Sequence, residues 1–232
     1  MMATGKLLLI TGTTGSGKTT TCKEFVARQD ELWLHFGADQ FLGGVMPRKF
    51  VDGGARAQDG LQKVPDDPNN PDGPRHLKLG RYGLQMFNTF HAMIAAGVRS
   101  GSNIIVDHIT TLEPPLLQSC IKHFRDLPVF FVALKPPLAV IPDRLDARLD
   151  KIVSNLDRTQ ANIANQNTKR MADFLYQQIF AHEHFDLIVD SNANSPSEVA
   201  DLIAAGLREK SGKAFAELAC KFDASQAPFN SR

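Results

Sequence analysis

Cysteine is scarce in this chain of 232 residues, and its spacing excludes two common uses. The three cysteines, Cys22, Cys120 and Cys220, are far apart and form no Cys-x-x-Cys unit. This spacing argues against a disulfide framework and against a zinc site. We therefore expect reduced thiols that serve as small core residues.

Long hydrophobic runs and an excess of one charge are also missing. The longest early apolar run, "LLLI" at residues 7–10, is too short for the core of a signal peptide or for a membrane span. The 26 basic and 25 acidic residues give a formal charge of +1, so no overall field attracts long nucleic acid or an anionic membrane. We expect a soluble, cytoplasmic protein, and nothing in the sequence predicts its oligomeric state.

Runs of β-forming residues alternate with helical patterns up to about residue 209. Such alternation is typical of βαβ units around a parallel sheet. Five strands are predicted, at residues 6–11, 32–38, 103–107, 129–134 and 185–190. Because 43% of the residues are hydrophobic, the chain can bury one sizeable core. We expect one domain over residues 1–232, with its core at 4–209.

The helical segments carry apolar stripes that we interpret as core. The stripe positions recur at helical spacing: Phe87, Phe90, Ile94 and Val98 in one segment, and Leu116, Leu117, Cys120, Ile121 and Phe124 in the next. The motif "SPSE", at Ser195 to Glu198, predicts the start of a final helix that ends near Arg208. Trp33 is interpreted as a core residue. The seven histidines are scattered, and we assign them no chemistry.

Two segments depart from this alternation of strands and helices. Residues 43–80 contain "PDDPNNPDGPR" and are too rich in proline, glycine, aspartate and asparagine for a long helix or strand, so we expect an insertion that leaves the sheet. Residues 211–232 form a tail after the last predicted helix. Its segment "KAFAELACKF" can form a short packed helix.

The stretch "GTTGSGKT" between the first strand and the first helix predicts a phosphate-binding loop. It matches Gly-x-x-x-x-Gly-Lys-Ser/Thr at every fixed position. Its glycines allow backbone N–H groups to turn toward phosphate oxygens, and the following helix adds the positive end of its dipole. The nucleotide-binding residues are expected to be Gly12, Thr13, Thr14, Gly15, Ser16, Gly17, Lys18, Thr19 and Thr20.

Within this loop, Lys18 is expected to contact the β- and γ-phosphates, and the Thr19 hydroxyl to bind Mg²⁺. A second acidic group is needed near the metal, and Asp107, which ends the third predicted strand, is the candidate. Its alternative role is that of a helix cap. No Asn-Lys-x-Asp element follows a strand, so we expect ATP rather than GTP.

A kinase also needs a base for the acceptor hydroxyl and cations around the migrating phosphoryl group. Asp39 follows the second predicted strand, at the edge of the sheet where ligands bind in open α/β folds. It is the candidate base, with a helix cap as the alternative. Arg144 and Arg148 are four residues apart on one face of a predicted helix, within a helical lid expected at 137–170. Arg158 and Arg170 are weaker candidates, and a solvated charged helix is the alternative.

Beyond the loop, the chain resembles the chloramphenicol phosphotransferase family of P-loop kinases over most of residues 6–205. The resemblance rests on four ordered segments: "WLHFGADQFLGGVMP", "FHAMIAAGVRSGSNIIVDHI", "DRLDARLDK" and "AHEHFDLIVDS". It implies a three-layer P-loop kinase fold, ATP and Mg²⁺ as cofactors, and Asp39 as the base that activates the hydroxyl of the acceptor. The sequence departs from the family where His108 follows Asp107, in residues 43–80, and in residues 151–169, which look like an enlarged lid.

The predicted function is therefore an ATP-dependent phosphotransferase that acts on a hydroxyl group of a small molecule, such as the antibiotic chloramphenicol. Two alternatives remain open at this stage. One is a kinase of a polynucleotide end or of a nucleotide-sugar, as in toxin-like P-loop kinases. The other is a regulator that binds ATP without modifying any substrate.

Overall fold

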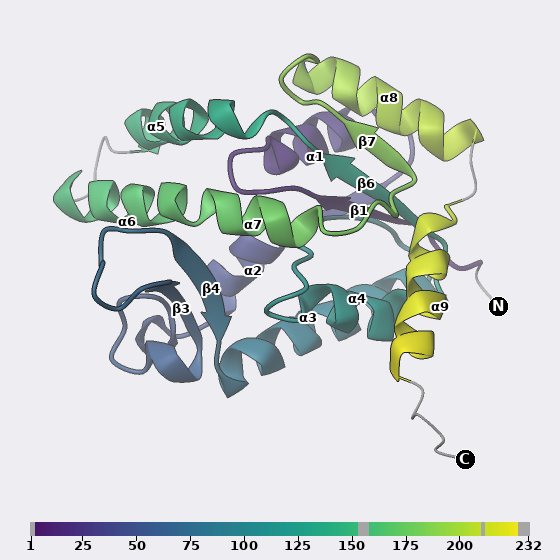
Figure 1. The fold of residues 1–232 in the computed structure, drawn as a ribbon. Coiled ribbons are helices and arrows are strands. Elements are labelled where there is room, and N and C mark those ends of the chain that lie inside the picture. Colours follow the sequence, from purple (N-terminus) through teal and green to yellow (C-terminus); the bar gives the residue numbers. More distant parts are fainter. Residues whose placement is uncertain (1–2, 153–157, 210–211, 227–232) are drawn as a thin grey trace.

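A parallel sheet of five strands forms the centre of the computed structural model, which describes residues 3–152, 158–209 and 212–226 (Figure 1). The strands, in spatial order, are β2 (Trp33–Gly37), β5 (Asn103–His108), β1 (Leu7–Thr11), β6 (Val129–Leu134) and β7 (Leu187–Val189). Every pairing in this sheet is parallel. The predicted sheet is confirmed, although its last strand is shorter than expected.

Helices cover both faces of the sheet and complete three layers (Figure 1). The helices α3 (Arg81–Arg99), α4 (Leu116–Phe124) and α9 (Ala214–Gln226) cover one face, and α1 (Lys18–Ala27) and α8 (Pro196–Glu209) cover the other. Because side chains alternate along a strand, Leu7 and Leu9 of β1 pack on the first face, and Leu8 and Ile10 pack on the second. This burial on both faces explains the continuous apolar strands.

The interpretation of the apolar stripes as core is confirmed for both predicted helical segments, because all nine stripe residues are buried. Trp33 is buried as well. The cysteine prediction is correct for Cys22 and Cys120 and wrong for Cys220, which is exposed. Helix α9 packs on the sheet through the buried residues Phe215 and Leu218, and Cys220 is not among its buried positions.

The insertion leaves the main sheet, as predicted, but it contains a hairpin that the sequence did not indicate. After α2 (Ala38–Val45) come two short 3₁₀ helices, η1 (Arg48–Phe50) and η2 (Ala57–Asp59), and an antiparallel pair formed by β3 (Leu61–Pro65) and β4 (Arg75–Leu79). This pair forms a separate two-stranded sheet. Its residue Leu77 is buried against Met171 and Leu175, so packing against a distant helix supports the hairpin.

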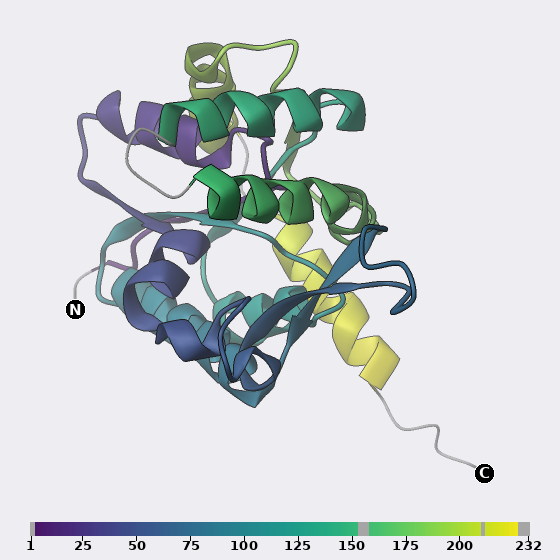
Figure 2. The same ribbon diagram turned by 90° about the vertical axis from the view of Figure 1, so that its left-hand side faces the viewer.

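The region after β6 is helical, as predicted for residues 137–170. It consists of η3 (Leu138–Val140), α5 (Ile141–Ile152), α6 (Arg158–Arg170) and α7 (Ala172–Ile179). Residues 153–157 of the predicted lid, and residues 211 and 227–232 of the predicted tail, lie outside the described residues. Figure 2 shows α5 and α6 extending over one end of the sheet, with the β3–β4 hairpin below α6. Within the described part of the chain, no helix is long and apolar enough to cross a membrane.

The predicted capping motif forms at the start of α8. The backbone N–H of Ser195 donates to Glu198 Oε2 at 2.8 Å, and the backbone N–H of Glu198 donates to Ser195 Oγ at 3.3 Å. Two N–H groups that have no partner within the helix are thereby satisfied.

Replacing Ser195 by alanine should lower the free energy of unfolding by about 1 kcal/mol, because the first turn of α8 loses its cap. Urea denaturation monitored by circular dichroism measures this change. Ser102→Ala is the control, since Ser102 is half-buried and its hydroxyl makes no hydrogen bond with the described residues. Equal losses in the two variants would contradict a specific capping role.

Candidate active site

The predicted phosphate-binding loop connects β1 to α1, as the motif requires. Gly12, Gly15 and Gly17 have positive φ values of 152°, 74° and 91°, which favour glycine. A Cβ atom at Gly12 would lie 2.6 Å from the carbonyl oxygen of Leu134, so the close approach of β6 also requires glycine there. The loop ends at Gly17, directly before the first residue of α1. The first N–H groups of a helix have no partner within it, so they can bind an anion here.

The Lys18 side chain folds back over this loop. Its Nζ donates to the carbonyl oxygens of Gly12 at 2.8 Å and Thr13 at 2.9 Å. Burial lowers the pKa of Lys18, although the negative charges of Asp107 and Asp39 act in the opposite direction. The charges of these two carboxylates thus favour the ammonium form of Lys18.

The other loop residues differ in exposure. Ser16 is buried, and its Oγ has no hydrogen-bond partner, while its carbonyl oxygen accepts a bond from Ser191 Oγ at 2.7 Å. Thr13 is buried and donates from Oγ1 to the carbonyl oxygen of Ala172 at 3.3 Å. Thr14 is half-buried, and Thr20 is exposed. The loop therefore contacts both the segment after β7 and the start of α7.

The two predicted metal ligands, Thr19 of α1 and Asp107 of β5, lie close together. The Thr19 hydroxyl donates to Asp107 Oδ2 at 2.6 Å. Oxygen ligands of these two types suit a hard cation such as Mg²⁺. Burial raises the pKa of Asp107, but the nearby His35 imidazole, the charge of Lys18 and the Thr19 bond together outweigh burial and lower it. The carboxylate is thus held in its charged form, which metal binding requires.

His35 is a neighbour of this pair that sequence reasoning missed. It lies on β2, and its Nε2 is 3.6 Å from Asp107 Oδ2. His35 of β2 pairs with Ile105, two residues before Asp107 on β5. Knowing this strand register would have placed His35 close to Asp107, but the sequence alone does not give the register.

Asp39 lies in the first turn of α2, immediately after β2. Its side chain is exposed and makes no hydrogen bond or ion pair with the described residues. The N-cap of α2 is Gly37, and no side chain caps this helix, so the geometry does not support a capping role for Asp39. Its charge acts on Lys18 and also on Lys63 of the β3–β4 hairpin. Asp39 is thus an accessible carboxylate between the loop and the insertion.

The two predicted lid arginines have different surroundings. Arg144 donates to the carbonyl oxygens of Gly15 at 3.3 Å and Ser191 at 2.8 Å, so it ties α5 to the phosphate-binding loop. Arg148, one turn later, is exposed and makes no hydrogen bond or ion pair with the described residues, but its charge acts on Lys18. Of these two arginines, Arg148 is the one that can approach a ligand without breaking a bond to the described residues.

Polar contacts connect the insertion to α6. Lys63 Nζ donates to Thr168 Oγ1 at 2.8 Å, and Arg170 donates to Asp72 Oδ1 at 2.9 Å. Of the weaker lid candidates, Arg170 is therefore engaged with the hairpin, and Arg158 is exposed. Lys63 was not identified from the sequence, because its position facing α6 depends on the unpredicted hairpin.

The comparison with protein families agrees with this arrangement. The model of the chloramphenicol phosphotransferase-like proteins matches residues 5–208. The chain belongs to this family. Family membership and the fold together indicate that the chain is a P-loop phosphotransferase. A search of the curated proteins gave no significant match.

Solved structures with a similar fold are only distantly related to this phosphotransferase-like chain. The crystal structure of APE1195 has a TM-score of 0.54 and 14% identity, covering 88% of this chain and 95% of that chain. The Mycobacterium tuberculosis APS kinase CysC, solved in complex with AMPPNP and APS, has a TM-score of 0.53 and 16% identity, covering 89% of this chain and 99% of that chain. At this level of identity the likeness shows the fold alone.

Proposed function

We propose that this phosphotransferase-like protein transfers the γ-phosphoryl group of ATP to a hydroxyl group of a small molecule, with Asp39 as the general base. The observation that carries the proposal is the convergence of Lys18, the Thr19–Asp107 pair and the exposed Asp39 at one end of the sheet. Ligands bind at this end in open α/β folds.

The phosphate-binding loop supplies N–H donors from the start of α1, and Lys18 supplies a positive charge for the β- and γ-phosphates. Thr19 and Asp107 would hold Mg²⁺, which neutralises charge on the phosphate oxygens when it is bound. Arg144 keeps α5 beside the loop, and Arg148 is the cation available to the migrating group. To contact the phosphates, Lys18 would exchange its bonds to the carbonyl oxygens of Gly12 and Thr13 for bonds to phosphate oxygens.

The Asp39 carboxylate would accept the proton of the acceptor hydroxyl as its oxygen bonds to the γ-phosphorus atom. The bond from that phosphorus to the bridging oxygen breaks, which leaves ADP and a phosphate ester. The exposure of Asp39 supports this role, because a base must be accessible to its substrate. Chloramphenicol is one acceptor to test, because the family is named after it. Other small alcohols belong in the same test, because the insertion at residues 43–80 departs from the family.

A transfer assay tests the proposal. The protein is incubated with Mg²⁺, ATP labelled in its γ-phosphate and a panel of alcohols that includes chloramphenicol, sugars and an oligonucleotide with a free 5′-hydroxyl. Label should appear on a small molecule above the level of ATP hydrolysis. Transfer only to the oligonucleotide would support a polynucleotide-end kinase instead. ATP binding without transfer to any acceptor would favour a regulator.

Replacing Asp107 by asparagine should raise the Mg²⁺ concentration needed for half-maximal activity by about tenfold or more, since a charged oxygen ligand is lost while its size is kept. Titration of activity against Mg²⁺ measures the shift. Asp190→Asn is the control, because Asp190 directly follows β7 and its carboxylate accepts a bond from the backbone N–H of Asn192 at 2.7 Å. An unchanged Mg²⁺ requirement in Asp107→Asn would exclude Asp107 from the metal site.

A further inference from the structure

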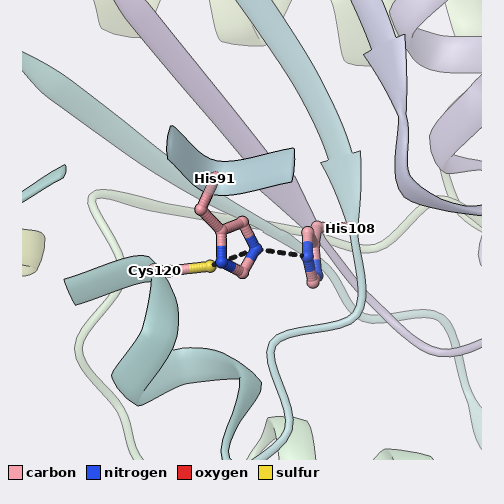
Figure 3. Close-up of side chains that lie close together, drawn as sticks. All are labelled: His91, His108 and Cys120. Atoms are coloured by element: carbon pink, nitrogen blue, oxygen red, sulfur yellow. Dashed lines mark hydrogen bonds between the residues drawn. The ribbon is translucent and has the colours of Figure 1, made fainter. Parts of the chain in front are cut away.

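Three side chains of metal-binding types meet in the core where α3 and α4 pack against the end of β5. His91 of α3, His108 at the end of β5 and Cys120 of α4 point toward one another (Figure 3). Their exposed fractions are 0%, 1% and 0%. Sequence reasoning assigned these residues no chemistry, because they are separated in the chain and come from three different elements.

The distances bring one ligand atom of each residue to a common point. His91 Nε2 is 2.8 Å from His108 Nε2, and Cys120 Sγ is 3.5 Å from His91 Nε2. Bonds of about 2.0 Å to nitrogen and 2.3 Å to sulfur place the ligand atoms of a three-coordinate ion roughly 3.5 Å apart. An ion therefore fits between the three atoms if the distance between the two Nε2 atoms increases by less than about 1 Å.

The remaining ring nitrogens already have the partners that orient metal-binding histidines. His108 Nδ1 lies 2.6 Å from the carbonyl oxygen of Ile109 and must donate to it, which leaves a lone pair on Nε2. His91 Nδ1 lies 2.7 Å from Ser119 Oγ, which can accept its proton when Nε2 binds a metal. A metal-bound imidazole is neutral, because the metal takes the place of a proton on Nε2.

The surroundings favour an ion of low charge. The two imidazole groups lie among the rings of Phe87, Phe90 and Phe124, at centroid distances of 5.5 to 6.3 Å. One thiolate and two neutral imidazoles carry a charge of −1, so a monovalent ion gives a neutral site and a divalent ion leaves a buried positive charge. Buried unpaired charge is costly. Soft ligands of this set select Cu(I) among monovalent ions.

We propose that His91, His108 and Cys120 bind one Cu⁺ ion through two Nε2 atoms and the thiolate of Cys120, which releases its proton on binding. Ser119, the partner of His91 Nδ1, also lines a cavity of about 480 Å³ between α3, α4 and Phe222 of α9, so the surface comes within one side chain of the site. His108 directly follows Asp107, but the copper site shares no residue with the proposed phosphoryl transfer, so either proposal can fail without the other.

The test uses the full chain with Cys220→Ser as the reference, so that an exposed thiol does not bind copper. The reduced protein, kept without oxygen, competes for Cu⁺ with a coloured Cu⁺ chelator. The reference should take up one equivalent of Cu⁺, and X-ray absorption should show one sulfur and two nitrogen ligands. Adding Cys120→Ser should weaken binding by about a hundredfold or more, whereas adding Cys22→Ser, which removes a buried thiol elsewhere, should not.

Ser119→Ala keeps all three ligands and removes only the partner of His91, so it should weaken Cu⁺ binding less, by about tenfold. Circular dichroism establishes that each variant is folded, and Ser119→Ala is decisive if Cys120→Ser does not fold. Equal Cu⁺ affinity in the Cys120→Ser, Ser119→Ala and reference proteins would overturn the site. If the reference protein kept bound Zn²⁺ when Cu⁺ was added, the choice of Cu⁺ as the ion would be wrong.

Discussion

Replacing Lys18 by alanine should lower kcat/KM for phosphoryl transfer by about a hundredfold or more, which corresponds to about 2 to 4 kcal/mol of transition-state stabilisation. The physical reason is the position of its ammonium group, which the carbonyl oxygens of Gly12 and Thr13 hold at the loop. Charge that develops on the transferred group would lose its nearest cation. Steady-state kinetics with the acceptor identified in the transfer assay measures the loss.

Lys23→Ala is the matched control for Lys18→Ala, because Lys23 lies on the same helix and is exposed. Thermal unfolding of the ligand-free proteins separates a catalytic from a structural effect. Removing this half-buried ammonium group should not lower the unfolding temperature, since the cost of its desolvation opposes folding. A loss of activity of the same size in both variants would refute a specific role for Lys18.

Replacing Asp39 by asparagine should lower kcat by about a hundredfold to ten-thousandfold and leave ATP affinity nearly unchanged. Asparagine keeps the size of the side chain but cannot accept the hydroxyl proton. Because Asp39 makes no hydrogen bond with the described residues, its replacement breaks no contact of the folded chain. Single-turnover kinetics measures the chemical step, and calorimetric titration with a non-hydrolysable ATP analogue measures binding.

Asp30→Asn is the control for Asp39→Asn, since Asp30 is an exposed acid that precedes β2 and Asp39 follows it. The control should behave like wild type. If Asp39→Asn instead lost ATP affinity to the same extent as Lys18→Ala, the division between a nucleotide site and a base would be wrong. Full phosphotransferase activity in Asp39→Asn would exclude Asp39 as the base.

The parts of the fold that follow from local rules could be predicted from the sequence. The Ser195–Glu198 cap and the glycines of the phosphate-binding loop are determined by residues within a few positions of one another. The Thr19–Asp107 contact was also predictable, because the carboxyl ends of parallel strands meet at one edge of the sheet.

Features that depend on distant partners could not be predicted in this way. The β3–β4 hairpin has a composition that is unfavourable for strands, and it forms where Leu77 packs against α7. The His91–His108–Cys120 cluster requires the packing angle of α3 and α4 on β5. The exposure of Cys220 depends on which face of α9 meets the sheet, and the sequence pattern of that helix did not determine it.

The junction of α6 and α7 at Met171 has a consequence for motion near the site. Helix α7 is anchored by apolar packing on the hairpin, whereas the bonds of Lys63 and Asp72 that connect the hairpin to α6 in the described part of the chain are polar. Polar contacts at a surface are individually weak, at about 1 kcal/mol or less. Separating α6 from the hairpin therefore costs little, whereas the bonds of Asn165 and Lys169 to Asp146 keep α6 joined to α5.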